Sequence, residues 1–174
     1  MTRFIAQRIT RTTIIRLAAP PGRVFPLFEP VGEKLWAHGW DPVMVYPPTG
    51  SPETNAVFTT QDHGGPPTVW IIAQFDPAQF RITYMRVAPD SHVATIAIDC
   101  TGEGAEMTAA RVTYTFTGLT AQGNAYVDTF SEDYYRAWLQ QWEGAINHYL
   151  SAAAHSNAPL AGHPHPTSHT KRSA

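Results

Sequence analysis

The sequence predicts an α+β fold, in which a curved antiparallel sheet of six to seven strands wraps around a long C-terminal helix, with two short helices after the first strand. Three observations support this prediction. Strand-length runs separated by proline, glycine and aspartate clusters fill residues 41–117, a pattern typical of an antiparallel meander. An aromatic stripe at helical spacing follows over 121–153, and a β-branched run opens the chain.

Composition limits the classes of protein to consider. The 174 residues are 43% hydrophobic, enough for one domain to bury a core without metals or disulfides. Cys100 is the only cysteine, which excludes disulfide frameworks, multi-cysteine zinc sites and iron–sulfur clusters. The net charge of -2 and the lack of a long basic run argue against nucleic acid as a partner. We expect no cofactor and no metal site.

The first seventeen residues spread arginines among isoleucines and threonines. They contain no apolar stretch of the length that a signal peptide or a membrane span requires. We therefore expect a cytoplasmic protein without an integral membrane segment. The sequence leaves the oligomeric state open.

The N-terminal elements follow from local composition. The β-branched run 5–15 predicts an opening strand, and Pro20 and Pro21 end it. A proline suits a first helical position, so a short helix is expected over 22–28. The spacing of Val31, Leu35 and Trp36 predicts a second brief helix.

Six further strands are predicted, over residues 43–46, 56–61, 68–75, 80–87, 93–101 and 108–117. In the last of them, Val112, Tyr114 and Phe116 alternate with polar residues, so they face a core. The same alternation turns Ile82 and Tyr84 inward. The run 69–72 is apolar at every position, so the face on which Trp70 lies stays open.

The C-terminal helix is predicted from one apolar stripe, formed by Val127, Phe130, Tyr134, Trp138, Trp142, Ile146 and Tyr149. Thr129 and Glu132 match a capping box, so the long helix is expected to start there, with 122–128 as a separate turn or a kinked first part. The composition then shifts to histidine, proline, serine and threonine. We expect a ligand-binding domain over 1–154 and a disordered tail over 155–174.

This order of elements implies an internal cavity. A curved sheet with one buried face must be covered, and the long helix is the largest element available to cover it. One helix cannot fill the concave face completely. An apolar cavity between sheet and helix is therefore expected, the kind of site where small molecules bind.

Three stretches resemble bacterial members of the START-like or SRPBCC superfamily, namely PGRVFPLF at 21–28, WAHGWDP at 36–42 and WEGAINHYL at 142–150. The resemblance covers about residues 5–152. It implies a helix-grip fold with a cavity between sheet and helix. The superfamily includes polyketide cyclases, aromatases and lipid-transfer domains, so the resemblance implies a scaffold and not a reaction.

The candidate ligand contacts are mostly aromatic: Trp36, Tyr84, Tyr114, Phe130, Tyr134, Trp138 and Trp142. These rings can form a stacking surface for an aromatic ligand, or they can be ordinary core packing. Arg86 falls in register with Tyr84, so its guanidinium can pair with a ligand carboxylate or phenolate, or it can extend to solvent. His38 lies between two tryptophans in a loop expected at the cavity rim.

The sequence assigns no catalytic residue. The titratable candidates are Glu33, His38, His63, His92, Asp99 and His148, and none has a partner that the sequence places beside it. We expect His92 and Asp99 to be solvated. No Gly-x-Ser-x-Gly elbow or nucleotide fingerprint is present, and the tail histidines lack the fixed geometry of a metal site.

The leading hypothesis is the binding of a small, largely hydrophobic ligand, aromatic or lipid-like, in the cavity. A polyketide cyclase or aromatase-like enzyme is the alternative, and it predicts a donor directed at a carbonyl deep in the cavity. A protein-interaction or chaperone-regulator module is a third hypothesis. It predicts a collapsed cavity and an exposed apolar patch around Trp36, Trp40 and Trp70.

Overall fold

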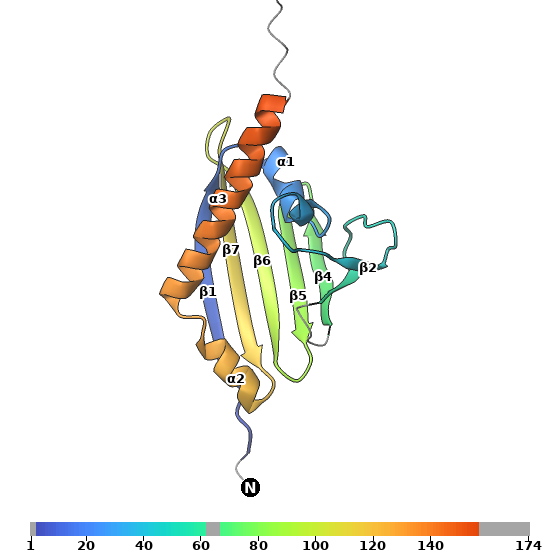
Figure 1. Ribbon diagram of the computed structural model, residues 1–174, viewed down its shortest axis with the longest axis vertical. Helices are drawn as coiled ribbons and strands as arrows, with labels where there is room; N and C mark the ends of the chain where they lie inside the picture. The colour runs from blue at the N-terminus through green and yellow to red at the C-terminus, as the bar shows by residue number, and fades with distance from the viewer. Residues whose placement is uncertain (1–2, 62–66, 157–174) are drawn as a thin grey trace, which may run out of the picture.

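The computed structural model describes residues 3–61 and 67–156, which form one antiparallel sheet with helices on its inner face (Figure 1). The sheet has seven strands in the order β1-β7-β6-β5-β4-β3-β2. The strands are β1 (Arg8–Leu17), β2 (Val43–Tyr46), β3 (Val57–Thr60), β4 (Thr68–Asp76), β5 (Arg81–Ala88), β6 (His92–Gly102) and β7 (Thr108–Gly118). The predicted fold class is confirmed.

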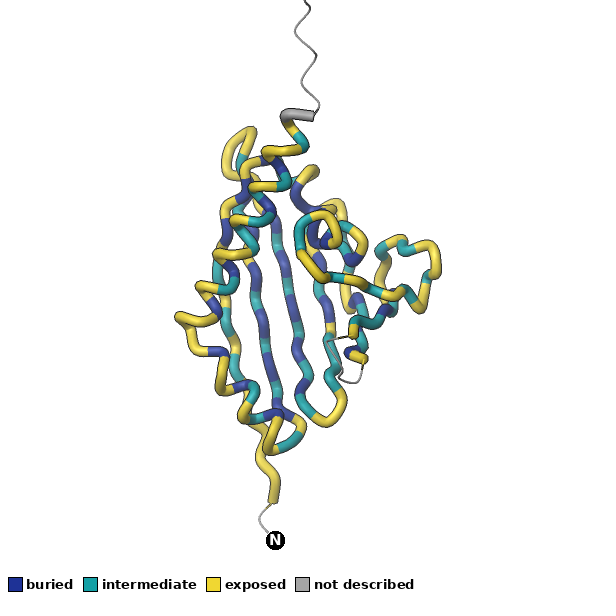
Figure 2. Tube along the Cα trace, viewed as in Figure 1, coloured by how far each residue is buried: buried dark blue, intermediate teal, exposed yellow. Residues whose placement is uncertain are grey.

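Buried and less buried positions alternate along the central strands, so one face of the sheet is the core face (Figure 2). Tyr84, Ile96 and Tyr114 lie opposite one another on β5, β6 and β7 and form one inward row. The neighbouring row contains Trp70, Arg86 and Ala94. Trp70 therefore lies on the inner face, which the apolar run alone left open.

The two predicted short helices are present, largely with 3-10 geometry. α1 (Pro21–Val24) runs directly into the 3-10 helix η1 (Phe25–Phe28), and η2 (Gly32–Leu35) follows. Gly32 lets η2 approach η1 closely, because a Cβ there would lie 1.8 Å from the carbonyl oxygen of Pro26. The indole nitrogen of Trp36 donates to the carbonyl of Leu27 at 2.7 Å and fixes the segment after η2.

The C-terminal region forms two helices, α2 (Ala121–Asp128) and α3 (Glu132–Ser156). The predicted capping box is wrong. Ser131 caps α3, because its Oγ accepts a hydrogen bond from the backbone nitrogen of Tyr134 at 3.2 Å. Thr129 instead closes α2 by donating its hydroxyl to the carbonyl of Tyr126. The last helix runs to Ser156, two residues past the predicted domain boundary, and the rest of the predicted tail lies outside the described residues.

α3 lies along the β1–β7 side of the sheet (Figure 1), and this placement decides which of its residues are buried. Tyr135 and Leu139 are buried, and the Tyr135 hydroxyl donates to the carbonyl of Val112 at 2.9 Å. Tyr134 is 54% exposed, so its predicted place in the buried stripe is wrong. Trp138 and Trp142 are half-buried and pack against the core beside this contact.

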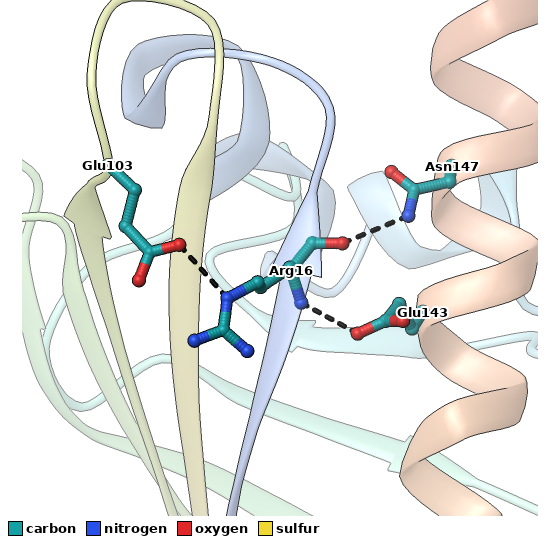
Figure 3. A network of polar contacts seen from close by, with 4 residues as sticks. All are labelled: Arg16, Glu103, Glu143 and Asn147. Carbon is teal, nitrogen blue, oxygen red and sulfur yellow. Dashed lines mark hydrogen bonds and ion pairs between the residues drawn. The ribbon is translucent and has the colours of Figure 1, made fainter.

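Side chains of α3 bond to the free backbone groups of the edge strand β1 (Figure 3). Glu143 accepts from the backbone nitrogen of Arg16 at 2.7 Å. Asn147 donates to the carbonyl of Arg16 at 2.9 Å. It also accepts from the backbone nitrogen of Ala18, directly after β1, at 2.8 Å. The Arg16 side chain turns the other way, to an exposed ion pair with Glu103. The helix therefore occupies the end of an edge that would otherwise be open.

We expect Asn147→Ala to destabilise the protein, because it removes both hydrogen bonds to β1. Each bond contributes about 1 kcal/mol, so the free energy of unfolding should fall by about 1 to 2 kcal/mol in urea titrations. His148 is the matched control, since its side chain is exposed on the same turn. His148→Ala should change the free energy by less than about 0.5 kcal/mol, and equal losses would contradict the anchoring role.

Candidate functional site

A cavity of about 310 Å³ lies on the inner face of the sheet. Its walls come from β3 to β7, from η2 and the loop after it, and from α3. The predicted ligand contacts that line it are Trp36, His38, Tyr84, Arg86, Tyr114, Trp138 and Trp142. The structure therefore brings these residues together at one site.

Two predicted contacts lie elsewhere. Phe130 is buried below the cavity and stacks on Phe116, with ring centroids 4.2 Å apart. Tyr134 touches the edge of Phe130 from the solvent side. Neither is among the residues that line the cavity. The break between α2 and α3 accounts for this, because it places Phe130 before the long helix starts.

Aromatic faces form the helix side of the cavity. Trp142 meets Trp36 edge-on at 5.4 Å between centroids, and Trp138 at 5.3 Å. Tyr114 lies 5.2 Å from Trp138 across the gap between β7 and α3. The rings hold one another in edge-to-face contacts, and such contacts fix ring orientation.

The opposite wall is also aromatic. Trp70 stacks on Phe58 at 5.6 Å and meets Trp40 edge-on at 5.3 Å. The indole nitrogens are already bonded, Trp70 to the hydroxyl of Thr60 and Trp40 to the carbonyl of Pro30. These side chains therefore contribute ring faces to the cavity and no free donors.

Arg86 points into the cavity, so the alternative that it extends to solvent is wrong. Its guanidinium carbon lies 5.5 Å from the centroid of the Trp70 ring, a cation–π distance. Nη2 contacts Nε2 of His92 at 2.5 Å and donates to the hydroxyl of Tyr126 at 3.2 Å. Nε is buried and has no hydrogen-bond partner among the described residues.

His92 is buried, so the prediction that it is solvated is wrong. It stacks on Tyr126 at 4.2 Å, and the ring of Phe116 lies 6.0 Å away. Burial and the nearby Arg86 lower the pKa of His92 to about 4. A neutral ring accepts from Arg86 at Nε2 and donates from Nδ1 to Ser91, at 2.9 Å.

Two oxygen groups on the cavity wall form no hydrogen bond with the described residues. Glu33 on η2 is buried, and desolvation raises its pKa well above the ordinary value. The hydroxyl of Tyr114 is likewise unpaired, and burial raises its pKa. The hydroxyl of Tyr84 differs, because it donates to the carbonyl of Phe28 at 2.7 Å. Burial therefore favours the neutral, hydrogen-bond-donating form of both side chains.

The remaining titratable candidates have other surroundings. Asp99 lies on the outer face in an ion pair with Arg81, as expected for a solvated residue. His38 is exposed at the rim, and His148 is exposed on α3. Burial raises the pKa of Cys100 to about 12, so its thiol is not a nucleophile at neutral pH. His63 lies outside the described residues.

The described residues contain no cluster of metal-ligating side chains. Within the same ranges, no helix is long and apolar enough to cross a membrane. The described wall of the cavity combines aromatic rings with polar groups, among them the guanidinium of Arg86, the carboxyl group of Glu33 and the hydroxyl of Tyr114.

No protein-family model matches the chain, and no curated protein matches it. Solved structures do. Norcoclaurine synthase from Thalictrum flavum, in complex with dopamine and hydroxybenzaldehyde, matches with a TM-score of 0.63 at 9% identity, covering 87% of this chain and 94% of that one. Ara h 8.0201 matches with a TM-score of 0.59 at 13% identity, covering 87% of this chain and 100% of that one.

A third match is DynU16, a protein of the dynemicin biosynthetic locus, with a TM-score of 0.55 at 18% identity. It covers 83% of this chain and 48% of that one. At such identities the likeness establishes the fold alone. The chain has the helix-grip fold that its sequence resemblance implies, with a cavity between the sheet and α3.

The sequence predicts most of the ligand contacts that line the cavity. It does not predict the burial of two titratable residues, Glu33 and His92. The sequence offers Glu33 as a titratable candidate without a predicted location, and the packing of η2 against η1 places it, buried, on the cavity wall. His92 begins a strand directly after a turn, so no local pattern marks it as buried. Its burial depends on α2, which is distant in the sequence.

The buried His92 predicts a pH dependence of stability. Because its folded pKa of about 4 lies below the ordinary 6.5, the unfolded chain takes up a proton first as the pH falls. His92 therefore contributes stability that is complete above pH 6.5 and is lost as the pH falls towards 4. His92→Gln keeps an acceptor for Arg86 but does not titrate.

Thermal unfolding of the native protein and of His92→Gln between pH 7 and pH 4.5 checks this. The native protein should lose more stability than the variant over that range. Other groups, including Glu33 with its opposite shift, titrate in both proteins and cancel in the comparison. Parallel curves would contradict the neutral, buried state of His92.

Proposed function

We propose that this protein binds a small, largely hydrophobic ligand with aromatic character in the cavity between the sheet and α3. The observation that carries the proposal is a cavity of about 310 Å³ whose walls are ring faces from both sides. This volume lies at the lower end of the range for small-molecule pockets. A ligand of one to three fused or linked rings fits such a space.

The described residues favour binding over a protein-interaction role. An interaction module was expected to have a collapsed cavity and to expose Trp36, Trp40 and Trp70. The cavity is open, Trp70 is buried, and the other two indoles are half-buried. Norcoclaurine synthase, which shares the fold, holds dopamine and hydroxybenzaldehyde, so this scaffold can accept small aromatic molecules.

A second candidate function is a cyclase or aromatase-like activity on a carbonyl-rich ligand. It is supported by the carboxyl group of Glu33 and the hydroxyl of Tyr114, two unpaired donors on the cavity wall. In such a reaction an enol carbon of the ligand attacks a carbonyl carbon and forms a carbon–carbon bond. The carbonyl oxygen takes a proton from one of these donors, and the proton released from the enol oxygen restores that donor.

Filling the cavity tests the binding function. Ile96 lies on the cavity floor, and Thr95 lies next to it on the outer face of β6. Ile96→Trp should weaken the binding of the neutral fluorescent probe N-phenyl-1-naphthylamine at least tenfold, because the new indole occupies the ligand's space. Thr95→Trp adds the same bulk outside and should leave the affinity within about twofold.

Native mass spectrometry of freshly expressed protein, followed by organic extraction, complements this titration. A released apolar molecule would identify the ligand class directly. If the native protein did not bind the probe, or if both tryptophan variants bound it equally well, the proposed function would be wrong.

The cyclase candidate needs its own test, with a linear poly-β-keto thioester as substrate and cyclic products followed by chromatography and mass spectrometry. Tyr114→Phe removes one donor and should lower the cyclisation rate on the order of 10²-fold. Tyr46→Phe, on the exposed strand β2, should have no effect. The same product rate with and without the native protein would exclude the activity for this substrate class.

A further inference from the structure

Arg86 lines the cavity, and the binding of a hydrophobic ligand does not account for its charge. It lies on the inner face of β5, between Trp70 on β4 and Ala94 on β6. Inward residues two positions apart on a strand are separated by about 7 Å. Arg86 is therefore one step along β5 from the row that holds Tyr84, Ile96 and Tyr114. The guanidinium thus occupies one end of the cavity floor.

The protein partners of Arg86 are all uncharged. Nη2 contacts the neutral ring of His92 and the hydroxyl of Tyr126. The face of the guanidinium lies over Trp70. Nε is buried without a partner, and Nη1 makes no hydrogen bond to a described residue. Nε and Nη1 are therefore available as hydrogen-bond donors, and the guanidinium has no counter-ion among the described residues.

The acids that line the cavity do not neutralise this charge. Asp41 forms an ion pair with Lys34 at 2.9 Å, at the exposed rim. Glu33 forms no ion pair with Arg86, and burial raises its pKa, which favours its neutral form. Asp99 and Glu103 do not line the cavity and form ion pairs with Arg81 and Arg16. Arg86 is half-buried and has no negative protein partner among the described residues, so a ligand in the cavity can supply one.

We propose that the ligand is an organic anion, with an apolar or aromatic body and one carboxylate or similar oxyanion that pairs with Arg86. This inference rests on the proposed function and names its ligand class. The body lies between the rings of Tyr114, Trp138 and Trp142. The anionic end accepts hydrogen bonds from the guanidinium, whose plane is fixed by Trp70, His92 and Tyr126.

The two ends of the cavity differ in charge, and this difference sets the orientation of the bound ligand. Glu33 belongs to η2, on the cavity wall that also holds Tyr84 and Tyr114. A second oxyanion at that end would meet a buried carboxyl group and two phenols, none of which carries positive charge. A neutral oxygen there can accept a hydrogen bond. The cavity therefore suits one anionic end and one neutral end.

Two fluorescent probes that differ by one anionic group test the inference. Anilinonaphthalene sulfonate carries a sulfonate, and N-phenyl-1-naphthylamine has the same ring framework without it. Arg86→Gln should weaken the binding of the sulfonate at least tenfold and change that of the neutral probe less than twofold. Arg86→Lys should recover part of the lost affinity, because the charge remains.

Arg111→Gln is the matched control. Arg111 is exposed on the outer face of β7, so its loss lowers the net charge equally without touching the cavity. It should leave both affinities unchanged. Ile96→Trp should weaken both probes, which assigns the signal to the cavity. Equal losses of both probes in Arg86→Gln would show a structural role and overturn the inference.

A displacement measurement on the native protein avoids any risk that Arg86→Gln fails to fold. 2-Naphthoate and 2-naphthamide have nearly the same shape and differ in charge. The acid should displace N-phenyl-1-naphthylamine at a concentration at least tenfold lower than the amide. Equal potency, or a more potent amide, would overturn the inference while leaving the proposed function intact. Failure of the native protein to bind either fluorescent probe would overturn both.

Discussion

The attachment of α3 to the edge strand β1 is the constraint on which the cavity depends. Glu143 and Asn147 bond to backbone groups of Arg16 and Ala18, so the helix is fixed over one side of the sheet. The inner face of β4 to β6 then has no long helix above it. η2 and the tryptophan-rich loop after it cover that part, and short segments cannot fill it completely. The cavity is the space left between the two covers.

The central strands place the polar groups of this cavity. Inward positions on β5 alternate with outward ones, so Tyr84 and Arg86 project from the same rigid strand. Groups held on a sheet keep their orientation better than groups on loops. Tyr84 uses its hydroxyl to bind the carbonyl of Phe28 and so joins η1 to the sheet. Tyr114, on β7, has the same kind of side chain but keeps its hydroxyl available to a ligand.

Period-two alternation predicted the inward residues of β5, β6 and β7, and helical spacing predicted Trp138 and Trp142. Both patterns depend on residues close together in the chain, so they can be recognised without knowing which segments contact one another. The pattern failed for Tyr134 and Tyr135, because adjacent tyrosines on a helix differ by only about 100° in direction. Which of them is buried depends on how α3 sits against β1. The burial of Glu33 and His92 also depends on segments far away in the chain.

The charges of the cavity differ from those of the whole protein. The chain has a net charge of -2, so its overall field gives an organic anion no long-range attraction. Inside the cavity, Arg86 contributes a positive charge without a negative protein partner among the described residues, and the adjacent His92 is neutral because burial and Arg86 lower its pKa to about 4. A preference for an anion would therefore arise after the ligand enters. It would lower the dissociation rate more than it raises the association rate. The neutral state of His92 is essential to this balance, because a protonated ring would add a second positive charge and lose its bond to Arg86.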